Sequence, residues 1–264
     1  MSKRDIQGIR TIVTGASSGI GRAIAHELAR RGGHTVLVAR RRDNLESLAA
    51  EIAADETATG KTEIVVGDVT DAMVRKAAIE RSVAAYGALD ALVNNAGIGA
   101  IGPFQESTPE RLRQIMEVNF FAAAEMTREA LGALQAGRSP IVVNIGSILG
   151  HRGLCQMSEY CSSKFALQGL SQSLRVELKK IGIDLLMVSP GTTRSEFFDS
   201  VVHGRGETPF PTGRGTTAAA VARKTVEAMR KGKREIIPSF SGWWLVWANK
   251  NAPGIVDYFM GRYA

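Results

Sequence analysis

The sequence predicts an α/β fold in which a seven-stranded parallel sheet is doubly wound, with helices on both faces. Short apolar, β-branched runs alternate along the chain with stretches of helical periodicity. Several of these runs end in small polar residues, at the edge where open α/β sheets bind ligands. The 264 residues suffice for a substantial core, so we expect residues 1–264 to form a single domain.

The composition narrows the class of protein. The net charge is +7 and the isoelectric point about 9.6, which fits an anionic ligand, a nucleic acid, a membrane surface or simply a basic exterior. No run of Lys and Arg is long enough for a nucleic-acid arm, and no apolar run reaches the roughly 18 residues of a membrane span. Cys155 and Cys161 suggest no metal or disulfide framework. We expect reduced core thiols, a cytoplasmic location, no bound metal and no nucleic-acid partner.

A glycine-rich turn follows the first predicted strand, residues 9–13. Its glycines have the spacing GxxxGxG, and a helical pattern begins directly after them. Glycines let the backbone approach a pyrophosphate, while the helix N-terminus supplies amide donors and the positive end of a dipole. The order strand, turn, helix therefore predicts a dinucleotide site. The residues expected to hold the cofactor here are Gly15, Ser17, Ser18, Gly19, Ile20 and Gly21.

The second strand, residues 35–39, ends in three arginines. At this position NAD enzymes place an acid for the ribose 2′-hydroxyl, and NADP enzymes a base near the 2′-phosphate. No acid stands at the strand end, and a guanidinium can bind a phosphate with two parallel hydrogen bonds. Arg40 and Arg41 therefore indicate NADP(H). The alternative is a solvated start of the next helix, residues 45–52, with Asp43 as its first-turn acid.

The third and fourth strands, Thr62–Val66 and residues 88–93, end in further candidates for cofactor contact. Asp68 could accept a hydrogen bond from an adenine amino group; the alternative is that it caps the helix that starts near Asp71. Small residues after the fourth strand would let the backbone lie against a cofactor. The residues assigned to cofactor binding in these two turns are Asp68, Val69, Asn95, Ala96 and Gly97.

The second half of the chain carries the chemistry. Residues 110–134 form a long predicted helix that places the amide of Asn119 among apolar residues, and the fifth strand, 140–145, leads to Ser147. A helix from residue 158 puts Tyr160 and Lys164 four positions apart, on one face. We expect the ammonium to lower the phenol's pKa from about 10, so that Tyr160 can exchange a proton near neutral pH. The alternative is an ordinary half-buried Tyr and a surface Lys.

These motifs together resemble the classical short-chain dehydrogenase/reductase superfamily. The matching residues are Thr14-Gly15-x-x-x-Gly19-x-Gly21, Asp68, Asn94-Asn95-Ala96-Gly97, Asn119, Ser147, Tyr160-x-x-x-Lys164 and Pro190-Gly191. They stand in the family's order and spacing over residues 9 to 195, and the whole length fits.

The resemblance implies a Rossmann fold and an NADP(H)-dependent oxidoreductase that transfers hydride between the nicotinamide and a carbonyl or secondary alcohol. It also implies a homodimer or homotetramer, built on the helices that start near residues 110 and 158. The catalytic residues carried over are Asn119, which holds a water linked to the lysine, Ser147, Tyr160 and Lys164. The last two also contact the cofactor, together with Pro190, Gly191 and Thr193; Ser195 falls where many members have a phosphate-contacting Thr.

The substrate pocket is expected to be apolar, which suggests a lipid-like carbonyl or alcohol. Its walls are Ser147, Leu149, Leu154, Met157 and Tyr160, and residues 192–215 are the expected lid. Residues 239–264 form an extension that contains all three tryptophans. Three readings stay open for it: core or oligomer contact, a wall of an extended pocket, or peripheral membrane contact.

A different class of function is a non-catalytic NADP-binding regulatory protein. The complete Ser147, Tyr160 and Lys164 set argues against it, because a binding protein has no use for a tuned tyrosine. Within the enzymes, an isomerase, epimerase or dehydratase would use the same fold.

Overall fold

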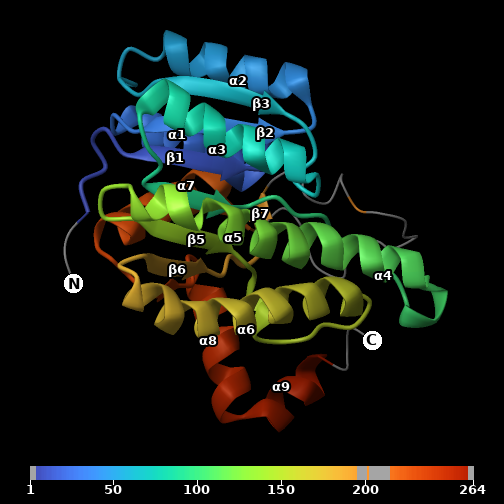
Figure 1. Cartoon of the computed structure of the whole chain (residues 1–264). Helices are drawn as coiled ribbons and strands as arrows, with labels where there is room; N and C mark the ends of the chain where they lie inside the picture. Colours follow the sequence, from blue (N-terminus) through green and yellow to red (C-terminus); the bar gives the residue numbers. More distant parts are fainter. Residues whose placement is uncertain (1–3, 195–200, 202–214, 261–264) are drawn as a thin grey trace.

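The computed structural model describes residues 4–194, 201 and 215–260, and it confirms the doubly wound α/β fold. Its main sheet has seven strands in the order β3-β2-β1-β4-β5-β6-β9, and every pair of neighbours is parallel (Figure 1). The strands are β1 Arg10–Thr14, β2 His34–Ala39, β3 Thr62–Val66, β4 Ala91–Asn94, β5 Ile141–Ile145, β6 Asp184–Val188 and β9 Glu235–Ile236. The chain order reverses between β1 and β4, which is where open sheets of this kind bind ligands.

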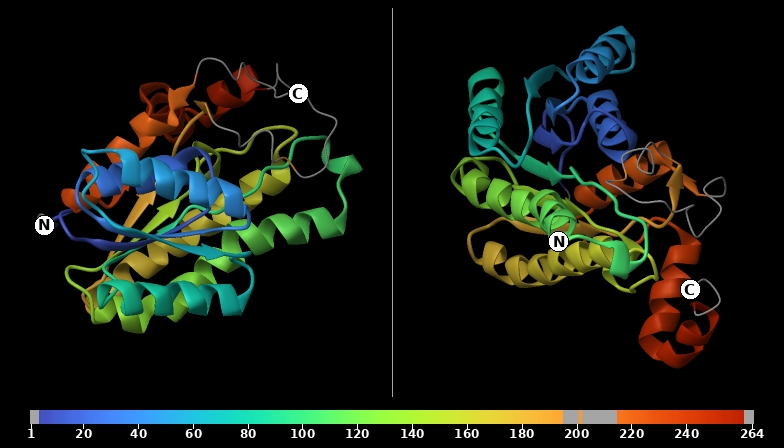
Figure 2. Two further views of the ribbon diagram at one scale, coloured as in Figure 1. Left: turned by 90° about the horizontal axis from the view of Figure 1, so that it is seen from above. Right: turned by 90° about the vertical axis from the view of Figure 1, so that its right-hand side faces the viewer.

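Helices cover both faces of the sheet (Figure 2). They are α1 Gly19–Arg30, α2 Arg42–Ala54, α3 Ala72–Tyr86, α4 Pro109–Met116, α5 Ala122–Gln135, α6 Ser158–Lys180 and α7 Ala218–Arg230. Neighbouring strand residues point into opposite cores. Val13 packs with the core of α1, α2 and α7, whereas Ile12 packs with that of α3, α5 and α6. The inner strands β1, β2, β4, β5 and β6 are buried on both faces, and they therefore read as mainly apolar runs, whereas the edge strands β3 and β9 are only partly buried.

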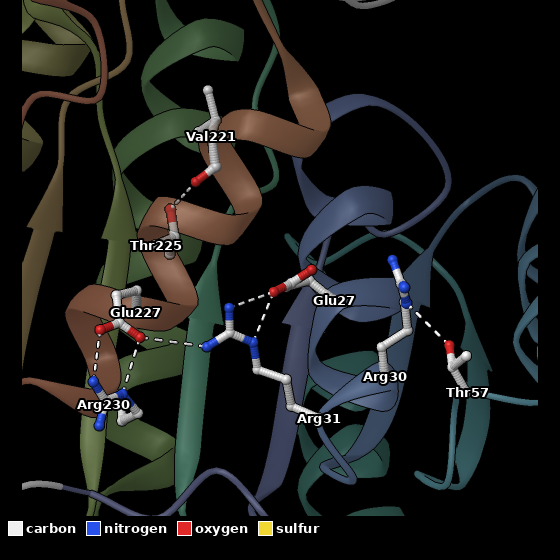
Figure 3. A network of polar contacts seen from close by, with 8 residues as sticks. All are labelled: Glu27, Arg30, Arg31, Thr57, Val221, Thr225, Glu227 and Arg230. Carbon is white, nitrogen blue, oxygen red and sulfur yellow. Dashed lines mark hydrogen bonds and ion pairs between the residues drawn. The ribbon is translucent and has the colours of Figure 1, made fainter.

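An ion-pair bridge joins two helices that lie far apart in the sequence, α1 and α7 (Figure 3). Arg31 at the end of α1 contacts Glu27 of its own helix at 2.6 Å and Glu227 of α7 at 3.5 Å. Arg230 binds the same Glu227 carboxylate at 2.7 Å. The bridge thus joins the ends of α1 and α7, which also pack against each other through apolar residues of one core cluster.

The helix predicted over residues 110–134 is interrupted. Between α4 and α5 lies a π-helical turn, Glu117–Phe121, in which the N–H of Ala122 donates to the carbonyl of Glu117, five residues back. Such turns occur often at functional sites, and this one contains Asn119. The prediction of a regular helix was therefore wrong at this turn.

Two helices follow the last strand of the main sheet, α8 Phe240–Asn251 and α9 Pro253–Met260. Ser239 caps α8, because its Oγ accepts from the N–H of Gly242. Figures 1 and 2 show that the two helices extend beyond the layers that enclose the sheet. We call them the C-terminal hairpin. Within the described residues, no helix is both long and apolar enough to cross a bilayer.

Asp90, just before β4, is a buried charge with a full set of partners. Arg10 donates to its carboxylate through two side-chain nitrogens, at 2.7 and 2.6 Å, and the N–H of Arg138 donates as well. Burial alone would raise the pKa of Asp90, but these donors outweigh it and leave the pKa below its usual value.

We expect Asp90→Asn to lower the free energy of unfolding by about 3 kcal/mol at neutral pH, because it leaves the guanidinium of Arg10 without its partner. Since the folded-state pKa is depressed, this stability is present above the unfolded pKa of about 3.9 and is lost as the pH falls through the folded value. Urea unfolding at several pH values measures the difference. The control Glu110→Gln removes an exposed carboxylate near Arg113 and should change stability by less than about 0.5 kcal/mol. Equal effects of both variants would contradict this account.

Candidate active site

A cavity of about 630 Å³ lies along the carboxyl ends of the strands. It runs from the glycine-rich turn after β1 to the start of α6 and the C-terminal hairpin. The expected residues that line it are Gly15, Ser17, Ser18, Gly19, Ile20, Arg40, Arg41, Asp68, Val69, Asn95, Ala96, Gly97, Ser147, Leu149, Leu154, Met157, Tyr160, Lys164, Pro190, Gly191 and Thr193. Gly21 and Asn119 do not line it; each supports a neighbour that does.

The glycine-rich turn is shaped by close backbone packing. Gly15 has φ +64°, and a Cβ there would lie 2.8 Å from the Cα of Ala96. A Cβ on Gly21 would lie 2.3 Å from Nδ2 of Asn95 and 2.4 Å from the carbonyl of Gly15. Asn95 locks the turn to the end of β4, because its Nδ2 donates to the carbonyls of Thr14 and Gly15.

The start of α1 is suited to an anion. The side chain of its N-cap residue, Ser18, makes no capping hydrogen bond, and the first turn contains no acidic residue. The amide groups there and the positive end of the helix dipole therefore face the cavity without an internal counter-charge. A turn whose glycines leave no Cβ at Gly15 and Gly21, next to these amides and two guanidinium groups, fits the phosphates of a dinucleotide.

The two arginines at the end of β2 differ in their contacts. Arg41 donates to Oγ of Ser17 in the glycine-rich turn, through Nη2 at 3.1 Å. Nη1 of Arg40 lies 3.6 Å from Oδ2 of Asp68, and both side chains are exposed, so this pair holds Arg40 only weakly. Arg41 is also the N-cap of α2, and Asp43 stands in that helix's first turn, as the alternative reading had it.

Asp68 does not cap α3. The N-cap is Asp71, whose carboxylate accepts from the N–H of Met73, so that alternative was wrong. Asp68 instead accepts from the backbone N–H and the hydroxyl of Thr70 with Oδ1, which fixes its turn at the cavity wall.

The other end of the cavity is lined by Tyr160, Lys164 and Ser147. Only 7% of Tyr160 and 4% of Lys164 are exposed, so the reading of Lys164 as a surface residue was wrong. Nζ of Lys164 donates to the carbonyl of Ile145 at 3.1 Å and lies 5.6 Å from the centre of the Tyr160 ring. Oγ of Ser147 accepts from the N–H of Leu149, which leaves its own proton to be donated.

Burial sets the proton affinities of this group. It raises the pKa of Tyr160, against a hydrogen bond with Ser147 that lowers it, and it lowers the pKa of Lys164 to about 8. The expectation that the neighbouring ammonium lowers the phenol's pKa was therefore wrong for the protein alone. Desolvation disfavours both charged forms and is the larger effect here. At neutral pH the phenol keeps its proton and can act as a donor.

Asn119 organises the neighbourhood from the π-helical turn. Its Oδ1 accepts from the N–H of Ile98, and its Nδ2 donates to the carbonyl of Ile98 and to Oγ of Ser163. A Cβ on Gly97 would lie 3.2 Å from Oδ1 of Asn119 and 3.6 Å from Nζ of Lys164, so the amide and the ammonium are close. The water-holding role of Asn119 stays a prediction.

The segment after Ser147 forms an apolar end of the cavity. It begins with a 3-10 turn, Ile148–Gly150, and Leu154, Met157 and Tyr160 pack there with Ile101. Cys161 is buried in the same cluster, and burial raises the pKa of its thiol, which disfavours the reactive thiolate. Cys155 is only partly buried, so the expectation of a core thiol is met by Cys161 and not by Cys155.

Most of the expected lid, residues 192–215, lies outside the described residues, and so does Ser195. The described ends come together: β7 Thr193–Arg194 pairs with β8 Thr216–Thr217. In addition, Val201 forms a bridge with Gly99.

One of the three readings of the tail, a wall of an extended pocket, agrees with the position of α8, although none of the lining residues of this helix was named from the sequence. Ser241, Gly242 and Leu245 line the cavity. A Cβ on Gly242 would lie 3.0 Å from Cγ2 of Ile148, so α8 packs closely on the segment after Ser147. The three positions share one helical face, a signal that an interpretation of the tail as a helix would have found.

Arg152 was not named from the sequence either. It lines the cavity and ties the C-terminal hairpin to it, because Nη1 donates to Asn249 at 3.1 Å and Nη2 lies 2.5 Å from the carboxylate of Asp257. Asn249 in turn donates to the carbonyl of His151.

Comparison with known proteins decides the family. The family described as short chain dehydrogenase matches residues 10–206. The chain belongs to the short-chain dehydrogenase family. Members are oxidoreductases, so the enzyme class expected from the sequence is confirmed at this level, and the reading as a non-catalytic regulator gains no support.

Individual relatives of this short-chain dehydrogenase span several organisms. The uncharacterized oxidoreductase YusZ of Bacillus subtilis is 37% identical over 72% of this chain and 66% of its own length. Mouse dehydrogenase/reductase SDR family member 7B is 29% identical over 100% of this chain and 83% of its own. A 3-ketodihydrosphingosine reductase of Bacteroides thetaiotaomicron is 32% identical over 72% of this chain and 65% of its own. The chain thus spans just under two thirds of the first and third of these proteins.

Solved structures agree on the fold. A short-chain dehydrogenase from Streptomyces avermitilis superposes with a TM-score of 0.83 at 29% identity, over 97% of both chains. One from Burkholderia phymatum, in complex with NAD, gives 0.84 at 22% identity over 96% of both chains.

We expect Gly21→Ala to destabilise the protein by roughly 1–3 kcal/mol and to weaken NADPH binding at least about tenfold, because its Cβ has no room between Gly15 and Asn95. Urea unfolding and fluorescence titration of NADPH measure the two effects. The control is Gly132→Ala in α5, where a Cβ would meet nothing within 4 Å and should stabilise by about 0.5–1 kcal/mol. Unchanged NADPH affinity in Gly21→Ala would refute the role of this packing.

Proposed function

We propose that this short-chain dehydrogenase is an NADP(H)-dependent oxidoreductase that transfers hydride between the nicotinamide and a carbonyl or secondary alcohol with an apolar body. The observation that carries the proposal is one cavity with two ends. Guanidinium and amide donors stand at the first end, and a buried tyrosine, lysine and serine stand beside apolar walls at the second.

The preference for NADP rests on the arginines. The residue after β2 is Arg40, whose exposed guanidinium can turn toward a 2′-phosphate, and Arg41 is held at Ser17 beside it. An acid that would favour the unphosphorylated ribose is missing from the end of β2. Solved relatives include complexes named for NAD and for 5-hydroxy-NADP, so the choice for this chain depends on its own residues.

The residues at the second end of the cavity have different roles in the proposed reaction. NADPH, when bound, supplies the hydride. Ser147 and Tyr160 hydrogen-bond the carbonyl oxygen of the substrate, which positions it and polarises its C=O bond. As negative charge develops on that oxygen, the phenol of Tyr160 transfers its proton to it. Lys164 stabilises the tyrosinate that remains and donates to the ribose of the cofactor, while Asn119 holds the Ile98 backbone and the hydroxyl of Ser163 in place.

Two observations support an apolar, lipid-like substrate. Leu149, Leu154 and Met157 form the wall next to Tyr160, and Leu245 of α8 adds to it. The relative from Bacteroides thetaiotaomicron is named for 3-ketodihydrosphingosine, a long-chain ketone. Reduction of a ketone on a long apolar body is therefore the reaction we assign.

The proposal also covers the oligomeric state, the membrane contact and the location of the enzyme. Exposed apolar side chains on the π-helical turn and on α6, among them Phe121 and Phe165, support a homodimer or homotetramer through these helices. The C-terminal hairpin is the proposed site of peripheral membrane contact. The cytoplasmic location stays a prediction.

We expect Tyr160→Phe to lower kcat by about 10²–10⁴ while NADPH binds nearly as before, because only the proton donor is removed. Steady-state loss of nicotinamide absorbance and a binding titration separate the two. The matched control is Tyr86→Phe, a half-buried tyrosine on α3 whose hydroxyl donates to the carbonyl of Thr35. Retained turnover in Tyr160→Phe would contradict the assignment of Tyr160 as the proton donor.

We expect Arg40→Ala to weaken NADPH binding about tenfold or more and NADH binding less than about twofold, because a charge-assisted hydrogen bond to the 2′-phosphate is lost. Arg42→Ala is the control, since Arg42 is exposed and pairs with Glu46 of its own helix. Equal losses for the two cofactors would refute the role of Arg40.

A further inference from the structure

The C-terminal hairpin exposes apolar stripes where surface helices are normally polar. On α8 the stripe is Phe240, Trp243, Trp244 and Trp247, with 78, 46, 45 and 46% of each side chain exposed. Their spacing of three and four residues places them on one face. On α9, Ile255, Tyr258 and Phe259 repeat this spacing with 62, 67 and 52% exposed. Scattered exposed apolar residues are ordinary, whereas a contiguous stripe marks a contact surface.

The α8 stripe is continuous. Trp244 packs edge-to-face against Phe240, Trp243 and Trp247, with ring centres 6.2, 5.3 and 5.1 Å apart. Each ring is only partly covered by its neighbours, and no other element in the described part of the chain buries these rings. The stripe therefore presents its aromatic surface outward.

The opposite face of the same helix belongs to the active site. Ser241, Gly242 and Leu245 line the cavity, while the stripe faces away from it. One helix thus separates the apolar end of the cavity from the exposed aromatic surface. Arg152 holds this wall in place through Asn249 and Asp257.

The charges of the hairpin favour a lipid surface. Residues 240–260 contain two charged side chains, Lys250 and Asp257. The negative one is paired with Arg152, which leaves Lys250 exposed on a protein of net charge +7. Tryptophan and tyrosine prefer the headgroup level of a bilayer, and lysine is attracted to anionic lipid. A protein partner would more commonly be met by a charged or polar rim around the aromatic centre.

We propose that the C-terminal hairpin docks on the surface of an anionic lipid bilayer, and that the cavity takes its ketone substrate from that bilayer past α8. Delivery of the substrate rests on the proposed oxidoreductase activity, whereas docking does not; docking specifies the lipid and the side chains of the peripheral membrane contact proposed above.

Intrinsic fluorescence tests docking directly, because all three tryptophans of the chain lie on α8 and need no label. We expect a blue shift on addition of phosphatidylcholine–phosphatidylserine vesicles, and quenching by lipids brominated in their acyl chains. Co-sedimentation with the same vesicles gives the partition coefficient. A full-length protein whose emission and sedimentation do not respond to vesicles would overturn the proposal.

A variant with Trp243→Gln, Trp244→Gln and Trp247→Gln tests which surface docks. We expect its partition into vesicles to fall at least about tenfold, because three interfacial anchors are lost. The matched control is Met73→Gln with Val176→Gln, two side chains 69 and 65% exposed on α3 and α6. Equal partition of the two variants would overturn the proposal. The proposal would also be overturned if the triple variant partitioned like the wild type but differed from it in oligomeric state, measured by light scattering, since the stripe would then bind a second copy of the chain.

Two ketones separate substrate delivery from catalysis. With a long-chain ketone held in vesicles, the activity of the triple variant should fall by about the same factor as its own partition into vesicles. With a short water-soluble ketone, its rate should equal that of the wild type. Loss with both ketones would overturn delivery from the bilayer. If the wild type reduces neither ketone but binds vesicles, the proposed function fails while docking stands.

Discussion

The ammonium of Lys164 is held almost out of water at the end of β5, and its position requires α6 to be seated against the sheet. Its hydrogen bond to Ile145 is only the last of a series. Deeper in the same interface Asn94 donates to Asn144 and Thr127, and Asn144 donates to Ser171 of α6. Buried amides of this kind are costly unless they are paired, and when paired they specify one register. The network therefore aligns β4, β5, α5 and α6, and with them the residues around Tyr160.

The fold and most of the site could be predicted from local patterns. Strand, glycine turn and helix follow from residues 9–30, and parallel strands must bring their carboxyl ends to one edge. That rule alone places Arg40, Asp68 and Asn95 beside the glycine-rich turn. Ser147, Tyr160 and Lys164 needed the family resemblance as well, because each has an ordinary structural explanation by itself.

What the sequence did not reveal depends on three-dimensional surroundings. The pKa of Tyr160 was assigned the wrong direction, since a neighbouring charge is visible in the sequence but desolvation is not. The π-helical turn at Asn119 shows no composition signal, because it arises from one extra residue in an otherwise helical run. The pocket reading of the tail named no residues of α8, because the packing of this helix on the segment after Ser147 is visible only in three dimensions.

As far as the structure describes its side chains, the C-terminal hairpin adds none to the apolar clusters on the two faces of the main sheet, and its helices add no strand to either sheet. It begins after the last strand and is tied to the active site through Arg152 and the close contact at Gly242. The cofactor half and the folding core can therefore stay constant while the terminal residues vary. A substitution in this short segment would alter the apolar end of the cavity or the exposed aromatic surface while leaving the glycine-rich turn and the two core clusters intact.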